Sequence, residues 1–263
     1  MQQYDQFLAF AHKMADAAGD FIRPKFRSDK SELGVDIKDD HSPIVTIVDT
    51  MVEETLRTMI MDTFPDHGVI GEEHDDHMPD ARYLWVIDPI DGTIAFTMGK
   101  ATFGTVIALF DEERPIMGLI DQPIMNERWV GVADRRTTLN GKPISTSQTT
   151  RLKEACAALN GAEHLCGMES MWGQVSSVLS SSKVHGFGGD CYNFGLLAHG
   201  SIDLVIEAEP DLCDFASMIP IVEGAGGIMT GWSGEILNRT YKGGVIATAH
   251  ADLHAEALDL LRR

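Results

Sequence analysis

One segment of the chain runs from an apolar strand straight into two acids: Trp85-Val86-Ile87-Asp88-Pro89-Ile90-Asp91-Gly92-Thr93. The run from Tyr83 to Ile87 is apolar and aromatic, which is typical of a buried strand. Pro89 fixes one backbone angle and Gly92 permits a tight turn. The pattern therefore predicts that two carboxylates emerge together, rigidly placed, at the end of this strand.

Two carboxylates three residues apart fit a hard divalent cation, since Mg²⁺ takes oxygen ligands at about 2.0–2.1 Å in an octahedral array. Asp88 has the position to bridge two such ions while Asp91 holds one of them, and the carbonyl of Ile90 adds a backbone ligand. The alternative is a solvated turn that Asp91 caps, which leaves the placement of both acids against an apolar strand unexplained. We therefore predict a metal centre at this turn.

Two more acids are candidate ligands. Glu72 directly follows the short apolar piece Val69-Ile70-Gly71, and a loop and a strand can bring it beside Asp88. Its alternative role is that of one member of an exposed acidic loop. Asp214 stands where a helix begins, so its alternative role is an ordinary N-cap, worth about 1 kcal/mol to the helix. With the other acids present, we expect Asp214 to be the third ligand of a second ion.

A hydroxyl and a further acid complete the expected reaction scheme. Thr93 follows the metal turn, and its hydroxyl can take a proton from a metal-activated water if a carboxylate stands behind it. Asp49, before a predicted helix, is that candidate, and its alternative role is the N-cap of the helix. Gly188-Gly189-Asp190 precedes another helix, whose free N–H groups can bind a phosphate; a plain turn is the alternative.

Composition excludes several classes of function. The formal net charge of -19 argues against nucleic-acid binding through a basic face, and bound cations would reconcile this acidity with a phosphate substrate. No apolar run is long enough to span a membrane, and the N-terminus resembles no secretion signal, so we expect a cytoplasmic protein. The four cysteines, Cys156, Cys166, Cys191 and Cys213, are predicted to be free thiols.

Helices and strands alternate in a way that predicts stacked layers of helix and sheet. Helices are expected at 3–26, 50–63, 168–179, 190–198, 215–223 and 253–261; strands at 83–87, 102–110, 115–120, 128–132, 204–206 and 245–248; a loop at 31–41. Asn140-Gly141 is a hairpin signal. We expect one integrated catalytic domain in two halves, residues 1–140 with most of the ligands and residues 141–263 completing the site.

Four motifs, in order, resemble those of the inositol monophosphatase family of metal-dependent, lithium-sensitive phosphatases. They are Val45-Thr46-x-x-Asp49, Ile70-Gly71-Glu72-Glu73, the segment Trp85 to Thr93, and Asp214-Phe215-Ala216 with Glu223-Gly224-Ala225-Gly226-Gly227. The resemblance spans nearly the whole chain. It implies an αβαβα layered sandwich of the α/β (α+β) class, assembled as a homodimer.

The resemblance also implies a role for each site residue. Glu72, Asp88 and the Ile90 carbonyl would hold the first Mg²⁺, while Asp88, Asp91 and Asp214 would hold the second, with a third, weaker ion near Glu72; Mn²⁺ is a possible substitute. Asp49 and Thr93, with Glu72, would activate the water. The phosphate and its ester would be contacted by Gly92, Thr93, Gly189, Asp190, Glu207 and Asp214.

Within the family, Gly118-Leu119-Ile120-Asp121-Gln122-Pro123 followed by Glu127-Arg128-Trp129 resembles the histidinol-phosphate phosphatase branch. Histidinol phosphate carries an ammonium and an imidazole, which Asp190 and Glu207 would attract, whereas inositol carries no charge besides its phosphate. Histidinol phosphate is therefore the expected substrate, in histidine biosynthesis. Inositol 1-phosphate, a sugar phosphate or a nucleotide is the alternative, and a non-catalytic cation-binding protein is the alternative from another class.

In the expected mechanism, one Mg²⁺ activates a water whose proton passes to Thr93 and Asp49. The water attacks phosphorus in line while the second Mg²⁺ stabilises the leaving oxygen.

Overall fold

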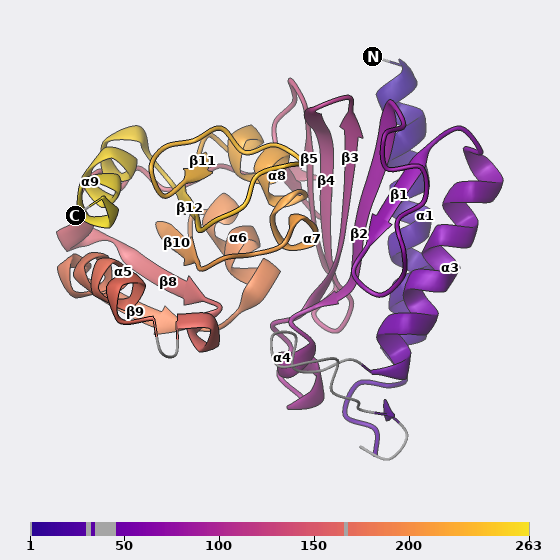
Figure 1. Ribbon diagram of the computed structural model, residues 1–263, viewed down its shortest axis with the longest axis horizontal. Coiled ribbons are helices and arrows are strands. Elements are labelled where there is room, and N and C mark those ends of the chain that lie inside the picture. Colours follow the sequence, from indigo (N-terminus) through magenta and orange to yellow (C-terminus); the bar gives the residue numbers. More distant parts are fainter. Residues whose placement is uncertain (1, 30–32, 35–45, 166–167, 263) are drawn as a thin grey trace.

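The computed structural model describes residues 2–29, 33–34, 46–165 and 168–262 and stacks them in alternating layers of helix and sheet (Figure 1). Three pairs of helices form the helical layers: α1 (Gln2–Ile22) with α3 (Ile47–Thr63), α6 (Asp190–His199) with α8 (Met218–Gly224), and α5 (Glu169–Ser181) with α9 (Ala251–Leu261). A seven-stranded sheet separates the first two pairs, and a five-stranded sheet separates the last two. This arrangement confirms the predicted αβαβα sandwich.

The first sheet has its strands in chain order, from one edge to the other. They are β1 (Gly68–Gly71), β2 (Tyr83–Asp91), β3 (Gly104–Asp111), β4 (Arg114–Gln122), β5 (Glu127–Val132), β6 (Thr138–Leu139) and β7 (Lys142–Pro143). Only β1 and β2 pair in parallel. The turn between β6 and β7 is Asn140-Gly141, whose φ angles of 49° and 74° confirm the predicted hairpin.

The outer helical layer packs on the first sheet through apolar side chains at helical spacing. Phe7 and Phe10 of α1 meet the ring of Trp85 on β2, with ring centroids 6.2 Å and 5.6 Å apart. α3 begins at Ile47 because Thr46 accepts the N–H groups of Val48 and Asp49 in a capping box. This layer fixes the strand that carries the two central acids.

The second sheet is formed by the second half of the chain in the order β11-β12-β10-β8-β9. Its strands are β8 (Cys156–Asn160), β9 (Val184–Phe187), β10 (Leu204–Glu207), β11 (Ile228–Gly231) and β12 (Val245–Thr248). β8, β9 and β10 run in parallel, and β12 pairs antiparallel with both β10 and β11. The register pairs Glu207 with Asn160, so both side chains lie at one end of the sheet.

The middle helical layer touches the first sheet at backbone distance. A Cβ added to Gly118 on β4 would lie 1.9 Å from the carbonyl oxygen of Ser217, and one added to Gly131 on β5 would lie 2.3 Å from that of Pro220. Any larger residue at these positions would push α8 away from the sheet. The two glycines therefore set the spacing between the halves of the site.

Several element boundaries differ from the sequence prediction. The first helix ends at Ile22 and not at 26, and the helix expected over 215–223 is divided into α7 (Leu212–Phe215) and α8. The remaining short helices are α4 (Thr93–Thr97), η1 (Leu152–Glu154) and η2 (Ala162–Leu165). Strands β8, β9 and β11 were not predicted. Of the loop expected at 31–41, only residues 33 and 34 are described. Cys166 lies outside the described residues.

Three cysteines, Cys156, Cys191 and Cys213, are free thiols, as predicted. In the part of the chain that the structure describes, no helix combines the length and the apolar character that crossing a membrane requires.

Candidate active site

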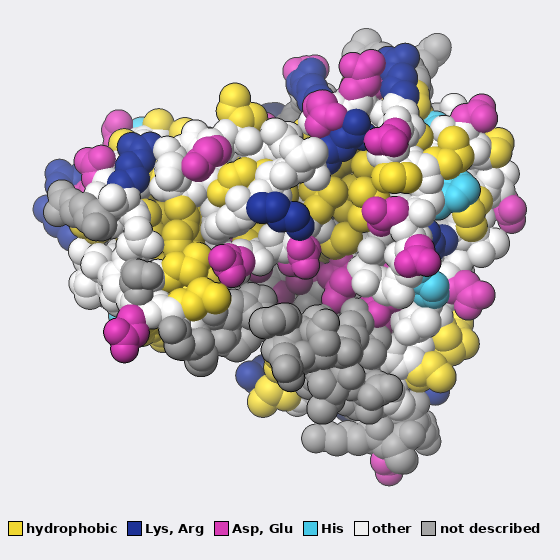
Figure 2. Space-filling model, in the orientation of Figure 1, with side chains coloured by type: hydrophobic (Ala, Val, Ile, Leu, Met, Phe, Trp, Pro, Cys, Tyr) yellow, Lys and Arg dark blue, Asp and Glu magenta, His cyan; other side chains and the backbone are white. Residues whose placement is uncertain are grey.

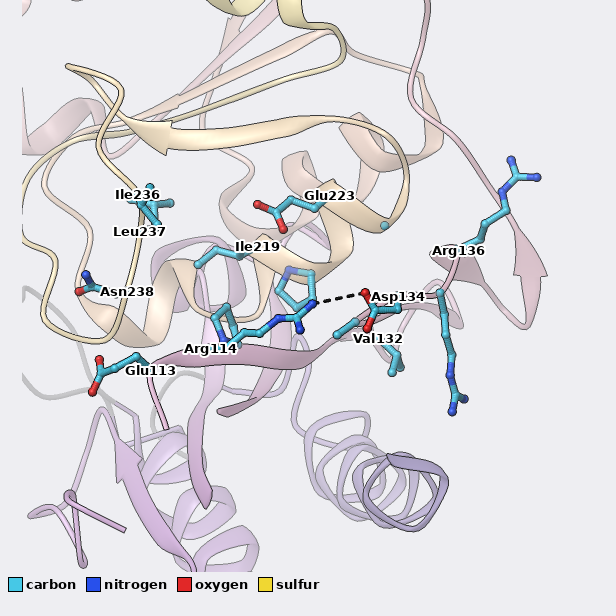
Figure 3. Close-up of a pocket in the computed structure, with 15 residues that line it drawn as sticks. Glu113, Arg114, Val132, Asp134, Arg136, Ile219, Glu223, Ile236, Leu237 and Asn238 are labelled. Atoms are coloured by element: carbon cyan, nitrogen blue, oxygen red, sulfur yellow. Dashed lines mark hydrogen bonds and ion pairs between the residues drawn. The ribbon is translucent and has the colours of Figure 1, made fainter. Parts of the chain in front are cut away.

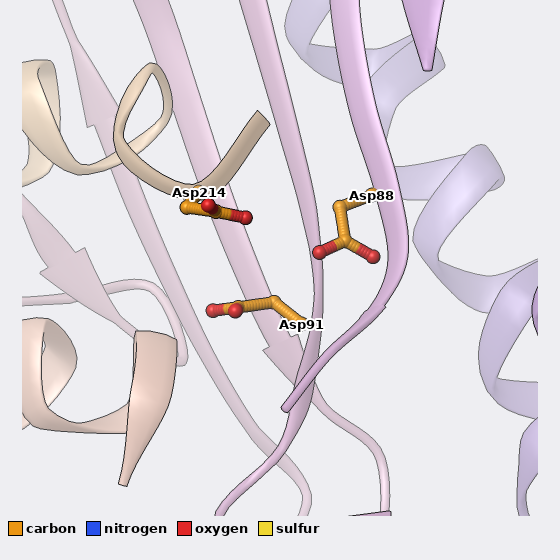
Figure 4. A group of neighbouring side chains, drawn as sticks. All are labelled: Asp88, Asp91 and Asp214. Carbon is orange, nitrogen blue, oxygen red and sulfur yellow. The ribbon is translucent and has the colours of Figure 1, made fainter. Parts of the chain in front are cut away.

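Three carboxylates converge between the two halves of the molecule. Each of Asp88, Asp91 and Asp214 offers an oxygen within 4.8 Å of the oxygens offered by the other two (Figure 4). Asp88 and Asp91 come from the end of β2, and Asp214 comes from α7, on the far side of the gap. Acidic side chains gather in a hollow near the centre of this face (Figure 2). The structure thus brings together three of the acids that the sequence singled out.

The end of β2 holds its two acids in fixed positions. Its pairing with β3 is interrupted between Asp88 and Asp91, which lets both side chains point toward the gap. The N–H of Ile90 donates to Asp88 Oδ1 at 2.8 Å, and the N–H of Cys191 donates to Asp91 Oδ2 at 2.6 Å. Because Cys191 is the second residue of α6, this bond ties the second half of the chain to the acid turn.

Asp214 does not cap its helix. Asp211 is the N-cap of α7, and Asp214 is the third residue of the helix, with its Oδ2 accepting the N–H of Asp211 at 2.8 Å. The sequence prediction places the helix start three residues too late, because it does not recognise the capping box Asp211-x-x-Asp214. The carboxylate of Asp214 thus serves the cap and also belongs to the acidic cluster.

The three acids repel one another when no cation is present. Burial, followed by the neighbouring charge of Glu72, raises the pKa of Asp88 well above its usual range, and burial with Asp190 does the same for the pKa of Asp91. Burial, followed by Glu72, raises the pKa of Asp214 to about 7. A compact, acceptor-only set of oxygens under such repulsion suits a hard divalent cation, which would remove the cost of ionising them.

Glu72 lies beside this cluster. It is exposed, it follows β1 directly, and it lines the same cleft as Asp88 and Asp214. Its charge acts on the pKa values of both, which places the carboxylate within electrostatic reach of them. Ile90 also lines the cleft, and its carbonyl accepts the hydroxyl of Thr93 at 3.1 Å. The structure therefore brings all the predicted ligands to one cleft.

The structure brings together Thr93 and Asp49, the two residues expected to take the proton. The hydroxyl of Thr93 lies 3.3 Å from Asp49 Oδ1, within reach of a hydrogen bond. Asp49 is not an N-cap but the third residue of α3, and its Oδ2 accepts the N–H of Thr46 at 2.9 Å as well as the Thr46 hydroxyl. Burial raises the pKa of Asp49 to about 6. A carboxyl of this pKa behind a hydroxyl can accept a proton near neutral pH.

The acids line a cleft of about 570 Å³ that also contains Gly92, Gly189, Asp190 and Glu207. Gly92 has a φ of 93°, and a Cβ there would lie 2.5 Å from Asp190 Oδ2, so no other residue fits without displacing Asp190. Gly189, at the start of α6, has a φ of 120°. The cleft thus brings the predicted substrate-binding residues together with the predicted ligands.

Glu207 is a buried acid at the back of the cleft. It is 9% exposed and is hydrogen-bonded to the Asn160 side chain, while its Oε2 has no hydrogen-bond partner among the described residues. Burial and three nearby acids raise its pKa well above the usual range. A buried carboxylate oxygen without a partner is costly unless a ligand supplies a donor.

Tyr192 also lines the cleft, although the sequence analysis does not predict it there. It lies just after Gly188-Gly189-Asp190 and contacts the motif Glu127-Arg128-Trp129. Its hydroxyl donates to Glu127 Oε2 at 2.6 Å, and its ring meets that of Trp129 edge-on at 5.3 Å. Arg128 of this motif and Asp121 of the preceding one do not line the cleft. Arg128 donates to Asp121 at 2.6 Å and also to Asp16 of α1. Lys100 also lines the cleft, and no local pattern marked it.

A larger cavity, of about 760 Å³, opens on another face of the molecule (Figure 3). Its lining includes charged side chains of both signs, and Arg114 and Asp134 pair across 3.4 Å. It contains none of the residues predicted for the site, so size alone does not mark the reactive cleft.

Comparison with known proteins gives consistent results. The chain matches the inositol monophosphatase family over residues 3–263. It is 41% identical to the chloroplastic bifunctional phosphatase IMPL2 of Arabidopsis thaliana, covering 98% of this chain and 76% of that protein. It is 31% identical to a histidinol-phosphatase of Streptomyces coelicolor, covering 100% and 99%. An inositol monophosphatase structure from Zymomonas mobilis matches with a TM-score of 0.89 at 42% identity, covering 99% of both chains.

Proposed function

The chain belongs to the inositol monophosphatase family and is a phosphoric monoester hydrolase, and from this premise we propose that it hydrolyses L-histidinol phosphate with the help of Mg²⁺. The names of its relatives include both histidinol-phosphatase and inositol monophosphatase, so relatives alone do not choose between the two substrates. A cation-binding protein without catalysis does not fit membership in a family of phosphatases.

The observation that carries the proposal is the convergence of carboxylate oxygens from Asp88, Asp91 and Asp214 within 4.8 Å. We propose that Glu72, Asp88 and the Ile90 carbonyl hold one Mg²⁺ and that Asp88, Asp91 and Asp214 hold a second, with a third, weaker ion beside Glu72. When bound, such ions polarise the attacking water and offset the charge that develops on the phosphate and the leaving oxygen.

The protein's own groups would move the proton and hold the phosphate. In the proposed step the attacking water gives its proton to the Thr93 hydroxyl, which passes its own proton to Asp49 Oδ1, 3.3 Å away. The water oxygen forms the new bond to phosphorus as the bond to the ester oxygen breaks in line, and the released oxygen takes up a proton from water to give the alcohol. The backbone N–H groups of Gly92 and Thr93, at the start of α4, and the turn at Gly189 would orient the phosphate oxygens.

The acids at the back of the cleft support histidinol phosphate as the substrate. Asp190 and Glu207 face the same cleft as the predicted ligands, and the Oε2 of Glu207 has no hydrogen-bond partner in the described part of the chain. An ammonium or imidazole N–H donor would satisfy that oxygen, whereas the ring of inositol offers only neutral hydroxyls. A charged hydrogen bond of this kind is worth roughly 1.5–3 kcal/mol.

Comparison of two substrates tests this assignment. The parent protein should have a higher kcat/KM for L-histidinol phosphate than for inositol 1-phosphate, measured as phosphate release with saturating Mg²⁺. Glu207→Gln should lower kcat/KM for histidinol phosphate by roughly tenfold to a hundredfold, and that for inositol 1-phosphate by much less. A parent that prefers inositol 1-phosphate would contradict the proposal and favour the alternative substrate.

We also propose that the halves 1–140 and 141–263 work as one catalytic unit and that the protein is a homodimer. Among the described residues, the edge strand β9 of the second sheet is a suitable surface for pairing with a second copy. Its side chains Val184 and Phe187 are 53% and 57% exposed. Sedimentation of the parent should give the mass of a dimer, and Val184→Lys should weaken it. A monomeric parent would contradict this part of the proposal.

A further inference from the structure

Glu72 stands on a short loop at the edge of the first sheet. The loop leaves β1, which is the edge strand next to β2 among the described strands of the first sheet. It returns at His77, whose N–H and carbonyl both bond to Val69. Glu72 itself is exposed. Because the side chain is exposed, the position of Glu72 beside the cluster also depends on how the loop backbone around it is fixed.

A buried acid of α3 fixes this backbone after Glu72. Glu53 is fully buried, and its Oε2 accepts the N–H of Glu73 at 2.7 Å while its Oε1 accepts the N–H of His74 at 3.1 Å. Arg57, one helical turn further along, lies 3.3 Å from Oε1 and also bonds to the carbonyl of Asp75. Both oxygens of Glu53 are thus used, and its charge is offset by a neighbouring guanidinium.

The same carboxylate also fixes the backbone before Glu72. A Cβ added to Gly71 would lie 2.3 Å from Glu53 Oε1 and 2.4 Å from its carboxyl carbon. The carboxylate therefore lies against the Cα of Gly71, and only glycine leaves room for it. Glu53 thus contacts the loop backbone on both sides of Glu72. Satisfying one buried N–H group would require only one of these contacts.

The helix that carries Glu53 also carries the proposed proton acceptor. Asp49, Glu53 and Arg57 are spaced four residues apart on α3, so they lie along one face of a rigid helix. Asp49 reaches Thr93, and Glu53 and Arg57 reach the loop. One helix face thus sets the distance between the proton acceptor and the loop that bears Glu72.

We propose that Glu53 is a positioning residue of the metal centre, which holds Glu72 in place by accepting two backbone N–H groups after it and by packing against Gly71 before it. This inference rests on the proposed function, in which Glu72 is a metal ligand. Groups that orient a ligand in this way typically change metal affinity by roughly 10-fold to 100-fold when they are replaced. Glu53→Gln replaces an acceptor by an N–H donor that faces another N–H, so it should loosen the loop.

The test measures binding of Mn²⁺ to the metal-free protein, by the electron paramagnetic resonance signal of the free ion, without any substrate. Glu53→Gln should raise the Kd by roughly 10-fold to 100-fold. The matched control is Glu54→Gln, the same change at the next residue of α3, which is exposed and should leave the Kd unchanged. Glu53→Asp, which keeps the charge, is the second variant if Glu53→Gln fails to fold, and it should raise the Kd in the same direction.

A double-mutant cycle separates positioning from general damage. If Glu53 acts through Glu72, Glu53→Gln should change the Kd of the Glu72→Gln variant far less than it changes that of the parent. Equal changes in the two backgrounds, or an unchanged Kd in the folded Glu53 variants, would overturn the inference. An unchanged Kd for Glu72→Gln alone would instead show that Glu72 is not a ligand, which is a failure of the proposed function.

Discussion

Replacing Asp91 by Asn should make the metal-free protein more stable while it destroys the activity. The oxygens of Asp88, Asp91 and Asp214 lie within 4.8 Å of one another, and at an effective dielectric constant near 20 each ionised pair at that separation costs about 3 kcal/mol. Asparagine removes the charge and keeps a carbonyl oxygen for the N–H of Cys191, now 2.6 Å from Asp91 Oδ2. Asp91 has two acidic neighbours in the cluster, but burial raises the pKa of all three acids and so reduces their ionisation. We therefore count the repulsion of one pair as the expected gain in the free energy of unfolding.

Thermal unfolding with a chelator and with Mg²⁺ measures this effect. Without metal, Asp91→Asn should unfold roughly 6–12 °C above the parent. With Mg²⁺, the parent should gain more stability than the variant, because Asp91→Asn removes a ligand of the second ion and leaves the ligands of the first ion in place. Turnover should fall by roughly a thousandfold or more, since several kcal/mol of transition-state stabilisation disappear with the ion.

The control is Asp80→Asn, which removes an exposed carboxylate in the loop between β1 and β2. It should change neither the metal-free melting temperature nor the response to Mg²⁺. The electrostatic reasoning would be refuted by a metal-free Asp91→Asn variant that is less stable than the parent. Full turnover in this variant, or an undiminished stabilisation by Mg²⁺, would refute the assignment of Asp91 as a ligand.

Three further changes have definite expected results. Thr93→Val should lower kcat by roughly 10²–10⁴-fold at saturating Mg²⁺, while Thr93→Ser, which keeps a hydroxyl near Asp49, should retain most of it; equal kinetics of the two variants would contradict the proton transfer. Gly92→Ala places a methyl group 2.5 Å from Asp190 Oδ2 at a φ of 93°, and urea unfolding should show a loss of about 1–2 kcal/mol or more. Burial lowers the pKa of His254 to about 4, so its contribution to the free energy of unfolding is present above about pH 6.5 and is lost toward pH 4, by about 3 kcal/mol. In urea unfolding, His254→Gln should flatten this dependence of stability on pH. An unchanged slope would contradict the assignment to His254.

The sequence predicts the central strand and its acids well, because the signal there is local. The apolar run up to Ile87 can only be buried, and a proline and a glycine around two acids leave the chain few conformations. The family motifs then supplied the distant residues, such as Asp214. Strands without a local signal were missed: Cys156–Asn160 is rich in alanine, and Ile228–Gly231 is short and ends in glycine. Pairing with neighbouring strands, and not intrinsic preference, makes these segments extended.

Capping was the other source of error. Asp49 and Asp214 were each read as a possible N-cap, yet both stand at the third helical position, with Thr46 and Asp211 as the caps. In both residues the Oδ2 atom accepts the N–H of the cap residue, and in Asp49 the Oδ1 atom lies 3.3 Å from the Thr93 hydroxyl. Glu53 was missed for a related reason: between Val52 and Leu56 it interrupts an apolar face, and a buried acid there has meaning only once the loop that it binds is known.

The convergence of oxygens from both halves has a consequence for how the enzyme comes into being. The ribosome adds Asp88 and Asp91 before any strand of the second sheet is made, and it adds Asp214 only after β10. In the proposed site an incomplete chain therefore has no cage for the second ion and no phosphatase activity. Loading of that ion would follow completion of the sandwich, so that hydrolysis in the cell begins only with finished molecules.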